Sequence, residues 1–118
     1  IWDRKNMDYC RVEVNGEVLA ERAKYCDTFF SRGLGLMFSK GAAVLVDTKE
    51  RVIGIHMMFV FQSLDVIWLD KDMKVVDVKR VKPFTLNHRP KSKAKYVVEL
   101  PVSNSKISEG DRISVSIS

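Results

Sequence analysis

The chain contains 118 residues, which is enough for one domain and too few for two domains of ordinary size. Hydrophobic residues make up 46% of it and charged residues 30%, which excludes an extended disordered chain, and no apolar run approaches the ~18 residues of a membrane-spanning helix. The formal net charge of +5 belongs to one segment, because residues 78–98 hold seven basic side chains and no acidic one.

The N-terminal residues are expected to lie outside the folded domain. Because the first residue is Ile1 and not methionine, we expect residues 1–9 to be an extension that follows a removed signal or anchor segment. Residues 10–118 would then form a single β-rich domain. This interpretation favours an exported or membrane-anchored protein over a cytoplasmic one.

A β-hairpin and a short helix are predicted next. Cys10–Val14 alternates apolar and polar side chains, and Asn15-Gly16 follows it, which is the strongest short hairpin signal because both residues tolerate positive φ. Glu17–Ala23 is the expected returning strand. A helix is predicted over Thr28–Leu34, with a capping residue at its start and glycine at its end.

The rest of the chain reads as short strands separated by polar turns. Asp47–Glu50 is one predicted turn, and residues 83–95 form a basic loop punctuated by proline. The predicted strands are Ala42–Val46, Arg51–Phe61, Leu64–Leu69, Val75–Val81, Tyr96–Leu100 and Ile113–Ile117. This spacing predicts a mainly-β fold: a single compact antiparallel β-barrel or sandwich-like domain with one short helix.

Four motifs, in order along the chain, resemble those of one known family. They are Arg32-Gly33-Leu34-Gly35-Leu36-Met37, the run Ile55–Asp70, Tyr96-Val97-Val98-Glu99-Leu100 and Gly110-Asp111. Together they resemble the domain of unknown function 192 family, whose bacterial members read roughly Phe-Trp-Met-Lys-Asn-Thr, an apolar pair and Pro-Leu-Asp-Ile in the central run. The resemblance covers about Arg11 to Val115. It implies a compact β-rich, barrel-like domain in bacteria and archaea, and it brings no established activity.

The chain departs from the pattern at four positions of the central run. Met58, Phe59 and Val60 stand where many relatives carry Lys, Asn and Thr, and Ser63 replaces the proline. Apolar residues replace polar ones there, which favours packing over chemistry. The departure is similar to an archaeal variant of the family.

A non-enzymatic binding site is the function that these residues favour. We expect a small molecule or a protein to be bound by an accessory domain, near Arg32, Met37, His56 and Asp65. Asp65 interrupts an apolar stretch, and a buried aspartate needs several donors to satisfy it. Those donors would be Arg32 or backbone amides at a turn.

A hydrolase-like enzyme is the alternative hypothesis from another class. His56 would act as general base, Asp65 or Asp70 would orient it, and a serine would attack the substrate. The sequence contains no Gly-x-Ser-x-Gly, no His-Glu-x-x-His and no glycine-rich phosphate loop. We therefore assign no catalytic residue.

The basic segment suggests a third hypothesis, the binding of a polyanion. Lysine and arginine side chains neutralise phosphates, and the interleaved Phe84, His88 and Tyr96 could stack on bases. Nucleic acid and an anionic lipid surface are both candidate partners. The residues concerned are Lys79, Arg80, Lys82, Arg89, Lys91, Lys93 and Lys95.

The two cysteines leave two interpretations open. Cys10 and Cys26 form either one disulfide or a pair of buried thiols. Together with two scattered histidines they do not give the paired ligand spacing of a structural zinc site. No metal and no cofactor are predicted.

Overall fold

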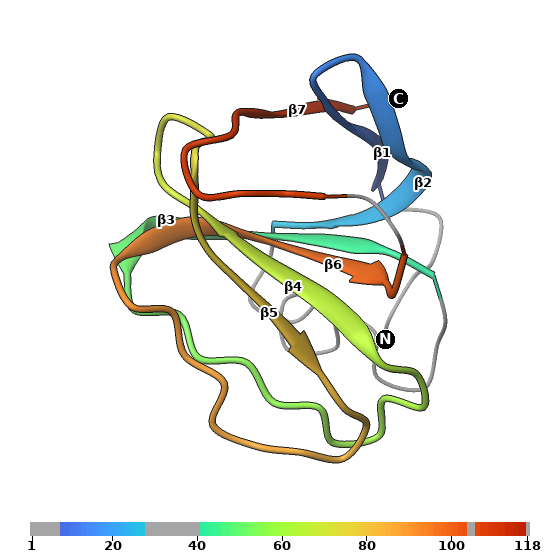
Figure 1. Cartoon of the computed structure of the whole chain (residues 1–118), viewed down its shortest axis with the longest axis vertical. Helices are drawn as coiled ribbons and strands as arrows, with labels where there is room; N and C mark the ends of the chain where they lie inside the picture. The colour runs from blue at the N-terminus through green and yellow to red at the C-terminus, as the bar shows by residue number, and fades with distance from the viewer. Residues whose placement is uncertain (1–7, 28–40, 104–105, 118) are drawn as a thin grey trace.

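The computed structural model describes residues 8–27, 41–103 and 106–117, and within these ranges it contains strands and irregular segments but no helix (Figure 1). The mainly-β prediction is confirmed, while the predicted helix Thr28–Leu34 lies outside the described residues. The seven strands are β1 (Asp8–Val14), β2 (Glu17–Cys26), β3 (Ala43–Arg51), β4 (Leu64–Leu69), β5 (Val75–Val81), β6 (Ala94–Pro101) and β7 (Ile113–Ile117).

The first hairpin forms where the sequence predicts it. β1 and β2 pair antiparallel, with Val14 opposite Glu17. The two residues of the turn, Asn15 and Gly16, have φ angles of 50° and 81°. Both lie in the left-handed region that a two-residue hairpin turn requires, and Asn and Gly enter it at low cost.

The seven strands form one sheet in the order β5-β4-β6-β3-β2-β1-β7. All neighbours are antiparallel except β2 and β3, which run parallel with Cys26 opposite Leu45. The sheet is therefore mixed, whereas antiparallel pairing throughout was predicted. A parallel pair needs a crossover connection of about a dozen residues or more, and the chain between Cys26 and Ala43 has that length.

The sheet curls until its two edge strands meet at one end only. Lys74 and Arg112, which precede β5 and β7, form an isolated bridge, and the amide of Val75 donates to the carbonyl of Asp111 at 2.8 Å. No strand ladder in the described part of the chain continues from this bridge. The sheet is therefore not closed into a barrel. We call the gap between the edges of β5 and β7 the seam.

The inner face of the curled sheet is one apolar cluster. Ile67 and Leu69 of β4 belong to the same buried cluster as Val12 of β1 and Ile113 of β7, although these strands stand far apart in the sheet order. The curl brings them together, so the two halves of one sheet cover each other. Burial of these side chains removes apolar surface from water and stabilises the curl.

The outer face of β4 is covered by a segment that is not a strand. Leu64, Val66 and Trp68 point to this face and pack with Ile53 and Met57. The prediction of a strand over Arg51–Phe61 is wrong, because β3 ends at Arg51 and the chain then crosses the face of the sheet. Buried and exposed side chains still alternate along this segment, and its sequence pattern is therefore that of a strand.

A bulge replaces the predicted turn Asp47–Glu50. These residues belong to β3, where the register against β6 shifts between Val46 opposite Tyr96 and Arg51 opposite Ala94. The carboxylate of Asp47 accepts bonds from the amide of Thr48 at 2.7 Å and from Arg51 Nε at 2.5 Å. The polar residues thus satisfy one another inside a continuing strand.

Both cysteines are free and buried. Cys10 belongs to the inner cluster and Cys26 to the outer one, so the sheet separates their sulfur atoms. Burial raises the pKa of the Cys10 thiol to about 11 and that of Cys26 to about 12. Both are therefore unreactive thiols at neutral pH.

The Trp68 side chain pins the covering segment to the sheet, and its loss gives a first prediction. Trp68 is fully buried, and its Nε1 donates to the carbonyl of Ile53 at 2.8 Å. We expect Trp68→Phe to lower the free energy of unfolding by about 2 kcal/mol, since it leaves a buried carbonyl unpaired and a small cavity. Urea denaturation followed by circular dichroism measures this change.

Val102→Ala, at a 41% exposed residue, is the control and should shift the free energy of unfolding by less than about 0.5 kcal/mol. Equal effects of the two substitutions would contradict the pinning role.

Candidate functional site

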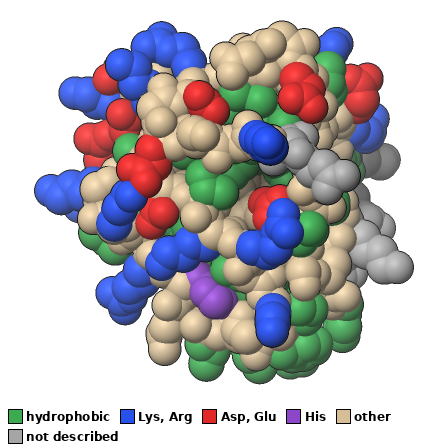
Figure 2. Space-filling model, in the orientation of Figure 1, with side chains coloured by type: hydrophobic (Ala, Val, Ile, Leu, Met, Phe, Trp, Pro, Cys, Tyr) green, Lys and Arg blue, Asp and Glu red, His purple; other side chains and the backbone are tan. Residues whose placement is uncertain are grey.

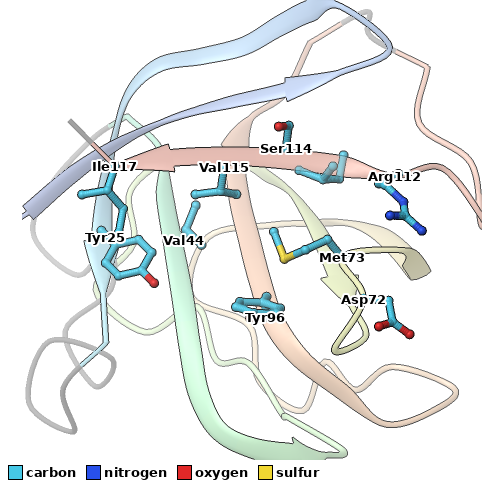
Figure 3. A pocket seen from close by; sticks show the side chains of 10 residues that line it. Tyr25, Val44, Asp72, Met73, Tyr96, Arg112, Ser114, Val115 and Ile117 are labelled. Carbon is cyan, nitrogen blue, oxygen red and sulfur yellow. The ribbon is translucent and has the colours of Figure 1, made fainter.

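A pocket of about 340 Å³ opens beside the seam, on the inner face of the sheet. Its wall is built by β2, β3 and β6 on one side and by β7 and the turn between β4 and β5 on the other (Figure 3). Val44 lies at the back of the pocket, between the rings of Tyr25 and Tyr96. We call this feature the seam pocket.

Strand alternation places the apolar part of the lining. Tyr25 lies directly opposite Val44 in the parallel pair, so both side chains point to the inner face. Tyr96 shares that face because it lies two residues before Val98 of the inner cluster. From β7, Val115 and its apolar neighbours on the same face complete the wall. The predicted alternation of Ile113, Val115 and Ile117 with serines is what aims them there.

The turn after β4 supplies the remaining apolar side chain. Asp70 Oδ1 accepts bonds from the amides of Asp72 at 2.8 Å and Lys74 at 3.0 Å, and this fixes the turn. Met73 has a φ of 66°, a left-handed conformation that costs a residue with a Cβ about 1–2 kcal/mol. In this conformation the Met73 side chain reaches into the seam pocket (Figure 3).

Two charged side chains, Arg112 and Asp72, stand at the rim of the seam pocket (Figure 3). Among the described residues, no ion pair engages the Arg112 guanidinium. Inside the pocket, burial first, and then the charge of Asp27, raises the pKa of Tyr25, so its phenol stays neutral at physiological pH. The pocket therefore offers an apolar body, two phenol groups and one available cation.

The structure does not bring together His56 and Asp65, the two predicted ligand residues that it describes. His56 is exposed on the segment that covers the outer face, and its Nδ1 accepts the amide of Met58 at 3.3 Å. Asp65 lies between Leu64 and Val66 on β4, so it points to the opposite, inner side. Arg32 and Met37 lie outside the described residues. The hydrolase hypothesis placed Asp65 or Asp70 beside His56, and the sheet separates His56 from Asp65.

Asp65 is satisfied by Arg80, which the sequence did not suggest, and by a backbone amide. Its carboxylate accepts a bond from Arg80 Nε at 2.9 Å, and the amide of Ser103 lies 3.5 Å from Oδ2. Arg80 also donates to the carbonyl of Ser103 at 3.3 Å. The pair thus ties β4 and β5 to the end of β6, which is a structural role.

The seven residues proposed for polyanion binding do not form one surface. Lys79 faces the outer side, where its Nζ lies 5.9 Å from the centroid of Trp68, whereas Arg80 faces the inner side with Asp65. Lys91 is paired with the carboxylate of Glu109. Two of the seven cations are therefore neutralised locally, and Lys79 and Arg80 face opposite sides of the sheet.

Glu99 is a buried acid that the sequence reasoning missed. It lies on β6 opposite Val66 and Ala43 and is only 5% exposed. No described residue offers a hydrogen bond to its Oε1. Burial raises the pKa of Glu99 to about 7. A signal was present in the sequence, because Val97 and Val98 are both apolar and so both faces of β6 had to be buried.

The raised pKa of Glu99 predicts a pH-dependent stability. Below about pH 4 the carboxyl is protonated in both states, and as the pH rises the unfolded chain loses this proton first. We expect the free energy of unfolding to fall by about 3 kcal/mol between about pH 4 and pH 8, relative to Glu99→Gln. Urea midpoints of both proteins across this range test it. If the urea midpoints of the two proteins changed with pH in the same way, the pKa of Glu99 would not be raised in the folded protein.

The described part of the chain contains no cluster of three or more metal-ligating side chains. In the same part, no helix is long and apolar enough to cross a membrane.

Comparisons with known proteins place the chain in a family. A family model, DUF192, described as "Uncharacterized ACR", matches residues 10–115. A UPF0127 protein of Thermococcus sibiricus is 42% identical over 95 residues, which are 76% of this chain and 61% of that protein. A UPF0127 protein of Thermococcus kodakarensis is 39% identical over 86% of this chain and 69% of its own length. The chain belongs to the DUF192 family and resembles its archaeal members. It spans about three fifths of the Thermococcus sibiricus relative.

Two solved structures share the fold. One is described as a putative transcription regulator of Sinorhizobium meliloti, with a TM-score of 0.78, 17% identity and coverage of 92% of this chain and 93% of that one. The other is a protein of unknown function from Novosphingobium aromaticivorans, with the same TM-score and identity and coverage of 92% and 84%. At this identity the likeness shows the fold alone.

Proposed function

We propose that the chain is a non-enzymatic binding domain and that the seam pocket holds its ligand, a small ring-bearing carboxylic acid. The observation that carries the proposal is the make-up of the pocket. About 340 Å³ of space is lined by apolar strand residues and two tyrosines, with Arg112 at the rim. Ligand sites of folded proteins commonly start at roughly 300 Å³ and combine an apolar lining with a few polar groups.

The lining indicates the shape and polarity of the ligand. Tyr25 and Tyr96 provide ring faces, against which flat apolar molecules stack at centroid distances of about 4.5–7 Å. The thioether of Met73 adapts to the edge of such a ring. A ligand with a flat apolar body would therefore use the interior of the pocket, leaving its polar end at the rim.

The rim indicates the charge of that polar end. Arg112 presents a planar set of donors that matches a carboxylate, and such bonds are about twice as strong as neutral ones. Asp72 stands on the same rim and would accept a hydroxyl or amino group of the ligand. The positive charge of Arg112 favours a carboxylate group on the ligand, and the negative charge of Asp72 disfavours a ligand with two negative charges.

A pair of probes with one ring system and opposite charges tests this function. We expect indole-3-acetate to bind with a Kd of about 0.1–1 mM, as its size allows, and to bind more tightly than tryptamine. Arg112→Gln should weaken indole-3-acetate about tenfold and should not weaken tryptamine, whose ammonium group it no longer repels. Amide chemical shifts of the seam-pocket residues in NMR titrations measure both affinities.

Matched substitutions on β7 provide the control. Val115→Phe fills the pocket and should abolish the shifts, whereas Ser116→Phe, on the opposite side of the same strand, should leave them intact. Equal affinity of the two probes, or equal loss in the two β7 variants, would contradict a carboxylate site in the seam pocket.

A further inference from the structure

Four large apolar side chains are exposed together at the tip of two neighbouring loops. Phe59 is 43% exposed, Phe61 57%, Phe84 46% and Leu86 56%. Figure 2 shows hydrophobic side chains gathered at the lower end of the molecule, where the segments after β3 and β5 lie in Figure 1. We call these four residues the phenylalanine tip. They lie far from the seam pocket in the fold and belong to none of the strands that line it.

The phenylalanine tip is attached to the core by backbone hydrogen bonds. Met57, which is fully buried, donates its amide to the carbonyl of Thr85 at 2.7 Å and accepts the amide of Phe84 at 2.7 Å. Ile55 and His88 exchange two further bonds, of 2.8 and 3.1 Å. The two loops therefore form one unit, with these polar backbone groups satisfied inside the protein.

The backbone holds the rings outward in an unfavourable conformation. Phe59 and Phe84 both have a φ of 59°, in the left-handed region that bulky residues rarely adopt. The ring of Phe84 meets Phe61 edge to face at a centroid distance of 5.3 Å and Phe59 at 6.0 Å. Strain of this kind persists where the surrounding structure enforces it, and it is frequent at functional sites.

The surroundings of the phenylalanine tip carry positive charge only. Residues 51–64 and 78–98, which include both loops, contain no acidic side chain. Lys82 and Arg89 are exposed on the second loop, on either side of Phe84 and Leu86. In Figure 2 no acidic side chain is visible at the lower end of the face shown.

We propose that the phenylalanine tip docks on anionic lipid bilayers, with its rings among the headgroups and Lys82 and Arg89 beside the lipid phosphates. Apolar side chains that enter the boundary between headgroups and acyl chains, flanked by cations, are the features that bind proteins to such a surface. A lipid surface fits better than a protein partner. The loops that carry the tip contain basic side chains and no acidic one, which complements a uniformly negative lipid surface better than a protein surface of mixed charge.

Vesicle binding tests the proposal with the 118-residue chain. We expect sedimentation with vesicles of phosphatidylglycerol and phosphatidylcholine, and little with phosphatidylcholine alone. The doubly substituted Phe61→Ser, Phe84→Ser protein should bind about tenfold more weakly or worse, since two rings no longer leave water. Lys82→Gln with Arg89→Gln should also lose about tenfold and show a shallower dependence on salt. Val102→Ser, at an exposed apolar residue outside the tip, should bind as the wild type does.

Phe84→Gly separates docking from folding. Glycine adopts positive φ without strain, so the urea midpoint should stay the same or rise although ring contacts are lost. Vesicle binding should nevertheless fall about tenfold. The proposal is overturned if the double serine variant keeps wild-type binding, or if Val102→Ser loses as much. It is also overturned if the chain self-associates through the tip without lipid, which would identify a protein interface.

Discussion

Strands β4 and β6 bury apolar side chains on both faces, so the described chain has to cover two faces of one sheet. Ile67 and Trp68 are neighbours in β4, yet they belong to different buried clusters, and Val97 and Val98 divide in the same way on β6. A single sheet with one wet face cannot bury such strands. The inner and the outer faces of these strands are covered in two different ways.

On the inner side the cover is the sheet itself. β1 and β7 fold back over β4 and β6, and the two edges of the sheet touch at one bridge. The seam pocket opens beside that bridge. Its polar rim, Arg112 and Asp72, comes from the segments that form the bridge, and its apolar lining comes mainly from β2, β3, β6 and β7.

The sequence predicted the strands well where a strand pairs with its chain neighbour. Asn15-Gly16 specified the first hairpin, and the alternation of Ile113–Ile117 specified the face of β7 that lines the pocket. The sequence failed where position depends on distant partners. Along residues 52–63 buried and exposed side chains alternate as they do in a strand, because alternate side chains pack on the outer face of the sheet. The segment lies over that face and does not pair with a strand of the sheet. Asp65 finds Arg80 through a strand pair, and Glu99 is buried by the cover over its face, which no local pattern shows.

On the outer side the cover is an irregular segment, and this is where the chain departs from the pattern of bacterial family members. Of the three apolar replacements, Val60 is buried and Met58 partly so, which agrees with the packing that the sequence favoured. Phe59 is exposed at a φ of 59°. The bacterial pattern carries asparagine there, a residue that adopts left-handed conformations readily. The turn geometry suits that asparagine, so the phenylalanine takes on strain while 43% of it stays exposed and its ring meets Phe84 edge to face. The strained turn thus keeps an apolar surface outside the core, and the neighbouring Phe61, Phe84 and Leu86 enlarge that surface.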